Sequence, residues 1–183
     1  MIQIPFDFTP EDEALIDEVA TRARPLESHF GSAIRKQSLI ARDYWVGFAG
    51  ELALSRYLTG GDEAFVRSRE QLEKGGTDCG EDVPGFRVDI KSSWASFNRP
   101  KKYHRLAVRP AQLLDGWIYI LGLYDDCRLT MMGWATTEEL RASFDKHTYG
   151  GFLGAHVIRA DKLNPMPGST EARQLWSIPS KRA

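Results

Sequence analysis

An acidic and a basic residue, Asp89 and Lys91, lie two positions apart in a stretch of alternating apolar and polar residues. Successive side chains of a β-strand point to opposite faces, so this alternation predicts that Asp89 and Lys91 share one face. The apolar residues of the stretch take the opposite face; they are Phe86, Val88 and Ile90. A carboxylate can bind Mg²⁺, and a lysine beside the ion can position an attacking water. The pair therefore predicts a site for metal-assisted hydrolysis.

Two more acidic residues precede this strand. Asp78 ends a glycine-rich turn, and Glu51 is the only charged residue between positions 45 and 55. A buried lone carboxylate costs several kcal/mol unless a cation or hydrogen bonds compensate, so Glu51 is a candidate metal ligand. The alternative is an exposed glutamate on an apolar helix. Gly47 and Gly50 lower the helix propensity around Glu51, so we expect this helix to lie close against a sheet.

Changes in the period of the apolar residues outline the elements that hold these side chains. A helix is expected at about residues 9–22, with Thr9 as its N-cap. A second helix is expected at about residues 42–58, ended by Gly60 and Gly61. The expected strands cover residues 64–67, 86–93, 105–108, 117–124 and 128–134.

The last part of the chain has weaker patterns. Asp125 and Asp126 predict a hairpin turn between the last two of those strands. Hydroxyl and acidic residues at positions 136–139 predict a helix start, with the helix continuing to about residue 144. A short strand near residues 156–159 and a C-terminal tail at about 160–183 complete the expected elements.

Length and composition favour one globular domain over residues 1–183, and the mixture of expected helices and strands makes its class α/β. The chain has 183 residues, of which 42% are hydrophobic and 27% charged. Its start has no apolar segment behind a basic one, and no apolar run reaches membrane-spanning length, so we expect a cytoplasmic protein with no membrane partner. Cys79 and Cys127 have no companions at metal-ligand spacing and are expected to be packing residues.

The formal net charge of −1 gives no general attraction to nucleic acid, so a binding surface must come from local asymmetry. No acidic residue occurs between Ile90 and Leu114, whereas basic residues are frequent there. We expect this segment either to contact phosphates or to be a solvated face, and His104 on its own favours a surface position. The candidate nucleic-acid-binding residues are Arg99, Lys101, Lys102, His104 and Arg105.

In order and spacing, these motifs resemble the PD-(D/E)XK nuclease superfamily, which has the restriction-endonuclease-like fold. The motifs are the Gly-x-x-Gly-Glu helix with Glu51, the acid Asp78 and the run Asp89-Ile90-Lys91. The resemblance covers about residues 42–145, and their later part resembles small phage-type members. It implies an αβββαβ core with a mixed central sheet flanked by helices. It also implies Mg²⁺-dependent cleavage of phosphodiester bonds, with Mn²⁺ as a substitute.

The same resemblance implies a role for each residue. Asp78 and Asp89, with the Ile90 carbonyl, would bind Mg²⁺, and Lys91 would be the catalytic lysine. Glu51 would bind a second ion or its water. Asp82 is the alternative to Asp78 if the turn before residue 86 is tight. We prefer Asp78, because Asp82 lies in an acidic run typical of a solvated loop.

Two other interpretations compete with the nuclease. Residues 60–65 are similar to the signature of diguanylate cyclases with Ala64 inserted, but the two glycines follow a helix and are better explained as its C-terminal cap. A catalytically silent module that binds nucleic acid or protein is the second alternative, because a fold does not fix function. We expect a metal-dependent deoxyribonuclease. The sequence leaves open the form of DNA, RNA as substrate, endo- or exonucleolytic cleavage and the oligomeric state, a homodimer included.

Overall fold

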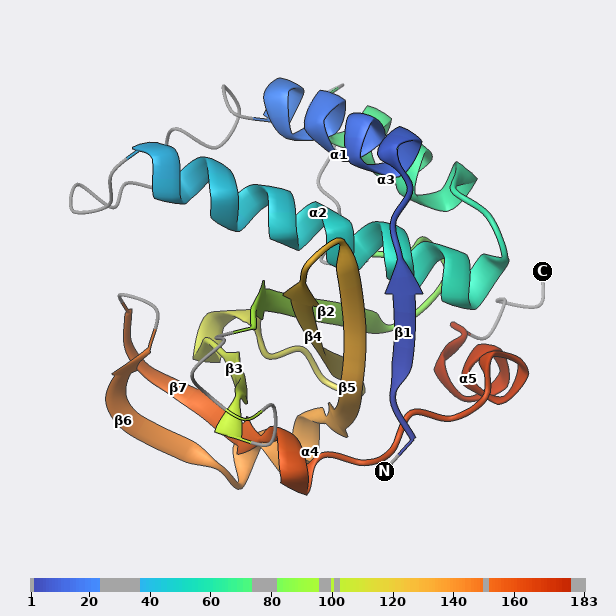
Figure 1. The fold of residues 1–183 in the computed structure, drawn as a ribbon. Coiled ribbons are helices and arrows are strands. Elements are labelled where there is room, and N and C mark those ends of the chain that lie inside the picture. Colours follow the sequence, from blue (N-terminus) through green and yellow to red (C-terminus); the bar gives the residue numbers. More distant parts are fainter. Residues whose placement is uncertain are drawn as a thin grey trace.

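The computed structural model describes residues 2–23, 37–73, 82–95, 100, 103–149 and 152–178. They form an α/β structure with helices over one face of a four-stranded mixed sheet and a three-stranded sheet against the other face (Figure 1). The helices are α1 (Pro10–Ala23), α2 (Gln37–Thr59), α3 (Glu63–Glu73), α4 (Thr137–Arg141) and α5 (Ser169–Trp176). The strands are β1 (Ile4–Asp7), β2 (Val88–Trp94), β3 (Arg105–Val108), β4 (Ile118–Asp125), β5 (Arg128–Thr136), β6 (Phe144–Tyr149) and β7 (Phe152–Arg159). The prediction of an α/β fold with a mixed sheet and flanking helices is confirmed.

The first sheet has the strand order β1-β5-β4-β2, which leaves β2 at one edge. β2 runs parallel to β4, whereas the β4–β5 and β5–β1 pairs are antiparallel. A parallel pair needs a crossover connection, and the chain between β2 and β4 makes it by way of β3. The second sheet, in the order β3-β7-β6, is antiparallel.

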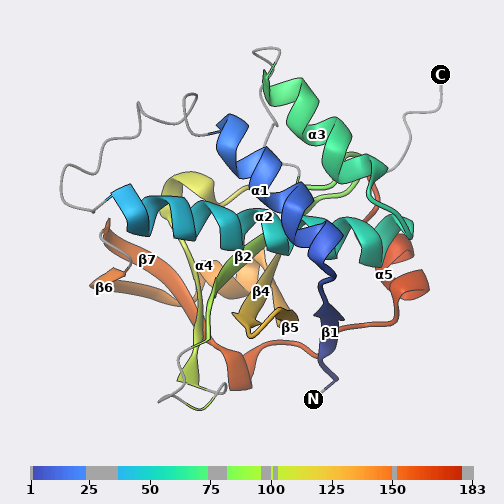
Figure 2. The same cartoon turned by 45° about the horizontal axis from the view of Figure 1, so that its top comes forward.

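Two hydrophobic clusters cover the two faces of the first sheet. Ile120 and Tyr124 of β4 belong to the cluster under α1 and α2. Tyr119, Leu121 and Leu123 belong to the cluster shared with the second sheet. This alternation is that of a strand buried on both faces. Figure 2 shows α1 and α2 crossing over the first sheet, with α3 beside them.

The helix starts and stops follow the expected capping chemistry. The Asp12 N–H donates to the Thr9 hydroxyl at 3.3 Å and the Thr9 N–H donates to the Asp12 carboxylate at 2.9 Å, so Thr9 caps α1 as predicted. α2 begins five residues before the expected start at residue 42. It ends at Thr59, and the φ of +85° at the following Gly60 is the left-handed conformation of a C-terminal cap.

Gly50 brings α2 against β2. A Cβ atom at position 50 would lie 1.9 Å from the Ser92 hydroxyl oxygen and 3.4 Å from a methyl carbon of Ile90. The predicted close approach of helix and sheet is therefore confirmed at Gly50. It does not extend to Gly47, where an added Cβ would meet nothing within 4 Å.

Several sequence predictions are wrong. Residues 64–67 are part of helix α3 and not a strand, because burial recurs at Phe65, Ser68 and Arg69 with the helical period. The helix after residue 136 ends at Arg141, because the chain enters β6 at Phe144. β1 and β6 were not expected at all.

The β4–β5 hairpin is confirmed, with its turn one residue later than expected. Asp126 and Cys127 have φ values of +45° and +60°, as a tight hairpin turn requires at both central positions. The turn leaves Cys127 exposed, so its prediction as a packing residue is wrong. Cys79 lies outside the described residues.

Candidate active site

Edge strand β2 carries Asp89 and Lys91 on one face. The Lys91 Nζ lies 2.5 Å from Asp89 Oδ2, and the two side chains are 28% and 11% exposed. Their register partners on β4 are Leu121 and Tyr119, which belong to the cluster between the sheets. The ion pair therefore lies on the side of the second sheet, with the lysine end open to solvent.

Asp82 joins this pair from the chain just before β2. The Phe86 N–H donates to the Val83 carbonyl at 3.1 Å, which closes a tight turn. Beyond that turn, the Ile90 N–H donates to Asp82 Oδ2 at 2.6 Å. Among the described residues, Asp82 is therefore the acid that precedes β2 and lies against it. Asp78 lies outside the described residues.

Electrostatics also place Asp82 with Asp89. Burial raises the pKa of Asp82 well above its ordinary value, and the negative charges of Asp89 and Glu51 raise it further, while Lys91 opposes the shift. Burial alone would lower the pKa of Lys91, but the carboxylates of Asp89 and Asp82 raise it above its usual range. Lys91 is thus an ammonium group at neutral pH.

The direction of the Ile90 carbonyl follows from the hydrogen bonds of β2 and its neighbouring residues. The Arg87 carbonyl accepts from the Ile118 N–H, and the Ala95 N–H donates to the Tyr124 carbonyl, both on the β4 side. The odd-numbered residues from 87 to 95 therefore direct their backbone hydrogen bonds toward β4. The Ile90 N–H instead bonds to Asp82 on the open edge. Because the N–H and C=O of one strand residue point to the same side, the Ile90 carbonyl also faces that edge.

Tyr119 lies beside Asp89 in the sheet and fixes the adjoining loop. Its hydroxyl donates to the Gln112 carbonyl at 2.8 Å and accepts from the Leu114 N–H at 2.7 Å. Tyr119 and Leu140 of α4 belong to the same cluster between the two sheets. Sequence reasoning did not select Tyr119, because an aromatic residue in an apolar strand carries no sign of function.

Glu51 is held by Arg69 of α3. The Glu51 Oε2 lies 2.5 Å from the Arg69 Nη2, and the side chains are 13% and 9% exposed. The prediction of a buried Glu51 with a compensating cation therefore agrees with the structure, but the compensating group that it shows is a guanidinium. Arg69 was not predicted as this partner, because residues 64–67 were expected to form a strand. Arg69 follows Phe65 by four residues, so a helix in this segment places both on its buried side.

The candidate nucleic-acid-binding segment is described only in part. Arg99, Lys101 and Lys102 lie outside the described residues. The expectation of a surface position for His104 is wrong, because this residue is only 8% exposed. Burial leaves it little area for contact with phosphate.

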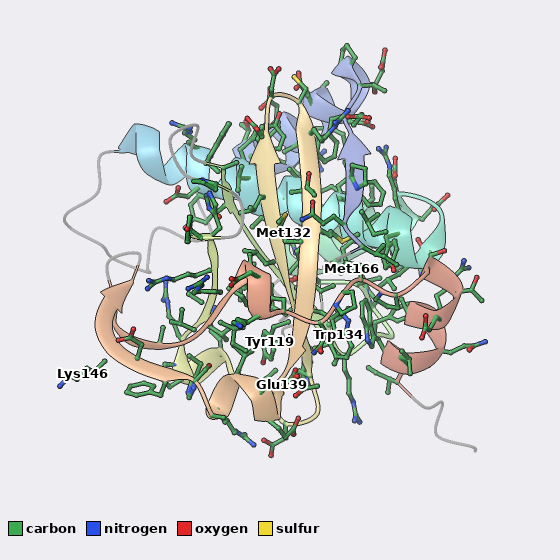
Figure 3. The ribbon with its side chains drawn as sticks, turned by 60° about the horizontal axis from the view of Figure 1, so that its bottom comes forward. Tyr119, Met132, Trp134, Glu139, Lys146 and Met166 are labelled. Atoms are coloured by element: carbon green, nitrogen blue, oxygen red, sulfur yellow. The ribbon has the colours of Figure 1, made fainter. Side chains whose placement is uncertain are left out.

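Arg105 is exposed and lines a cleft of about 650 Å³ on the second sheet. It lies directly opposite Arg159 of β7 in the strand register. Like charges at opposed positions are unfavourable, and Asp161 offsets part of the charge by pairing with Arg159. Lys146 lines the same cleft and extends outward from β6 (Figure 3). The cleft thus offers three cationic side chains.

Within the described ranges, no three histidine, cysteine, aspartate or glutamate side chains are grouped so that together they could hold a metal ion.

Comparison with protein-family models, curated proteins and solved structures gave no match. Of the helices in the described part of the chain, none is long and apolar enough to cross a membrane.

Proposed function

We propose that the chain is a metal-dependent nuclease that hydrolyses phosphodiester bonds in DNA. The observation that carries this proposal is the gathering of Asp82, Asp89 and Lys91 around the edge strand β2. The proposal keeps the resemblance to the PD-(D/E)XK superfamily and replaces Asp78 by Asp82 as the first acid. In this assignment α2 is the leading helix of the restriction-endonuclease-like core, and β2 is the strand with the Asp-x-Lys motif.

The donor set fits Mg²⁺ or Mn²⁺. These ions prefer oxygen ligands and are commonly bound by one or two carboxylates, with water and backbone oxygens completing the shell. Asp82 and Asp89 supply the carboxylates and Ile90 supplies a carbonyl on the same strand edge. Burial and then the negative charges of Asp89 and Glu51 raise the pKa of Asp82, and a cation bound between the carboxylates would relieve that repulsion.

The metal ligands and Lys91 have different roles in the proposed reaction. When bound, a divalent ion at Asp82 and Asp89 polarises the phosphate and lowers the pKa of a coordinated water. Lys91 is an ammonium group that orients the attacking water and offsets the charge that develops on the phosphate oxygens. Its short distance to Asp89 holds the ammonium group next to the metal ligands.

The proposal is tested by cleavage of labelled DNA with and without Lys91. Lys91→Met keeps the apolar stem and removes the charge, so we expect cleavage in Mg²⁺ or Mn²⁺ to fall by about 100-fold or more. Ser93→Ala is the matched control, because this exposed residue has the same orientation on β2 and no assigned role. Duplex, single-stranded and branched DNA and RNA are assayed with each metal ion and with EDTA.

Two results would count against the nuclease. One is cleavage by Lys91→Met at the rate of the parent. The other is the absence of metal-dependent cleavage of any of these nucleic acids by the folded parent, which would favour a silent binding module.

A further inference from the structure

Arg69 is a buried arginine whose head group contacts two residues of α2. Its Nη2 lies 2.5 Å from Glu51 Oε2, and its side chain is only 9% exposed. Its guanidinium carbon lies 5.0 Å from the centre of the Phe48 ring. Figure 2 shows α3 alongside the helical layer that includes α2. These contacts fix the guanidinium group against the carboxylate of Glu51.

Glu51 lies on the turn of α2 that packs against the strand of the metal site. It follows Gly50, where an added Cβ would lie 3.4 Å from a methyl carbon of Ile90, and the Ile90 N–H donates to Asp82. Without Arg69, Glu51 would therefore be a further carboxylate beside this strand, available to a second cation. With Arg69 in place, its charge is already balanced at short range.

A second divalent ion at Glu51 would meet a strong obstacle. An ion bound there would lie close to a guanidinium that cannot lose its proton. If the metal ion displaced Arg69 from Glu51, the guanidinium group would be buried without a partner, which is strongly destabilising. The ion pair thus competes directly with metal binding at Glu51.

We propose that Arg69 is a positioning residue that commits Glu51 to an ion pair and limits the site to one divalent cation, bound through Asp82 and Asp89. This inference rests on the proposed metal site. It assigns Glu51 to the surroundings of the ion and departs from the expectation that Glu51 binds a second ion or its water.

Calorimetric titration of the metal-free protein with Mn²⁺ tests the proposal, because it counts ions per chain without measuring activity. We expect one ion for the parent and one for Arg69→Lys, which keeps the charge. Arg69→Met should bind a second ion, because Glu51 is then released. Glu51→Gln in the Arg69→Met background should return the count to one. Arg67→Met, at an exposed position of the same helix, is the matched control and should behave as the parent does.

Two ions bound by the parent, or one ion bound by folded Arg69→Met, would overturn the inference and leave the nuclease proposal standing. A parent that binds no Mn²⁺ would end both. Circular dichroism checks the fold of each variant. If Arg69→Met does not fold, the numbers of Mn²⁺ ions bound by the parent and by Glu51→Gln are compared. One ion bound by each protein supports the inference. Two ions bound by the parent and one by Glu51→Gln contradict it.

Discussion

At the residue scale, the short spacing of Asp89 and Lys91 was readable from the sequence, whereas the contact of Asp82 with their strand was not. The period of a strand alone puts residues two apart on one face. That contact depends on the path of the chain before β2. The tight turn at Val83 and Phe86 determines that path, and its backbone hydrogen bond leaves no mark in the pattern of side chains.

The raised pKa of Asp82 predicts a pH dependence of stability. In EDTA, the folded state holds a proton on Asp82 at pH values where the unfolded chain, with a carboxyl pKa of about 4, has released it. The free energy of unfolding contributed by this group is therefore present below about pH 4 and is lost as the pH rises towards the folded pKa. Asp82→Asn keeps an acceptor for the Ile90 N–H and removes the titration.

Urea unfolding of both proteins from pH 4 to pH 8 measures this difference. We expect Asp82→Asn to gain stability relative to the parent as the pH rises through this range. Asp115→Asn is a suitable control, because the Asp115 side chain is 84% exposed and should show no such gain. A constant difference between Asp82→Asn and the parent would contradict the assigned electrostatics.

At the element scale, α2 and its glycines were largely predictable, whereas α3 was not. Gly50 interrupts an apolar helical pattern, and close packing on a sheet is a physical reason for a glycine there. α3 contains buried Ser68 and Arg69, so its buried face is partly polar and a search for apolar periodicity misses it. Because α3 was not predicted, Arg69 was not recognised as the partner of Glu51.

Alanine at the two glycine positions of α2 should change the free energy of unfolding in opposite directions. Gly50→Ala should lower the free energy of unfolding by about 1–3 kcal/mol, because the new methyl group overlaps Ser92. Gly47→Ala should raise it by up to about 1 kcal/mol through helix propensity, because the position is open. Urea titrations of the parent and both variants measure the two effects.

A second substitution checks the cause. Ser92→Ala removes the hydroxyl oxygen that lies 1.9 Å from the added Cβ and leaves the Ser92 Cβ at 3.1 Å. Combined with Gly50→Ala it should therefore restore part of the lost stability. Equal effects of the alanine at positions 47 and 50 would mean that α2 does not depend on close approach to β2.

At the scale of the whole molecule, β2, β4 and β5 were anticipated from their alternating patterns and a mixed sheet from the family resemblance, but the second sheet was not expected. β3 was expected at its observed position, yet its partner β7 lies about 50 residues later and pairs with β6 on its other side, and such long-range pairing is not encoded in local periodicity. The second sheet covers one face of β4 and carries the cleft lined by Arg105 and Arg159.

The measurement that tests the central claim most directly is thermal unfolding of the parent and Asp82→Asn, each in EDTA and in Mn²⁺. A ligand that binds only the folded state stabilises it by about 2.7 kcal/mol at 100 times its Kd, which for a chain of this size raises Tm by about 5–10 °C. We predict this rise for the parent and its loss in Asp82→Asn, which in EDTA should be at least as stable as the parent. No Mn²⁺-dependent shift in the parent, together with a lower Tm for Asp82→Asn in EDTA, would contradict the metal site and the nuclease built on it.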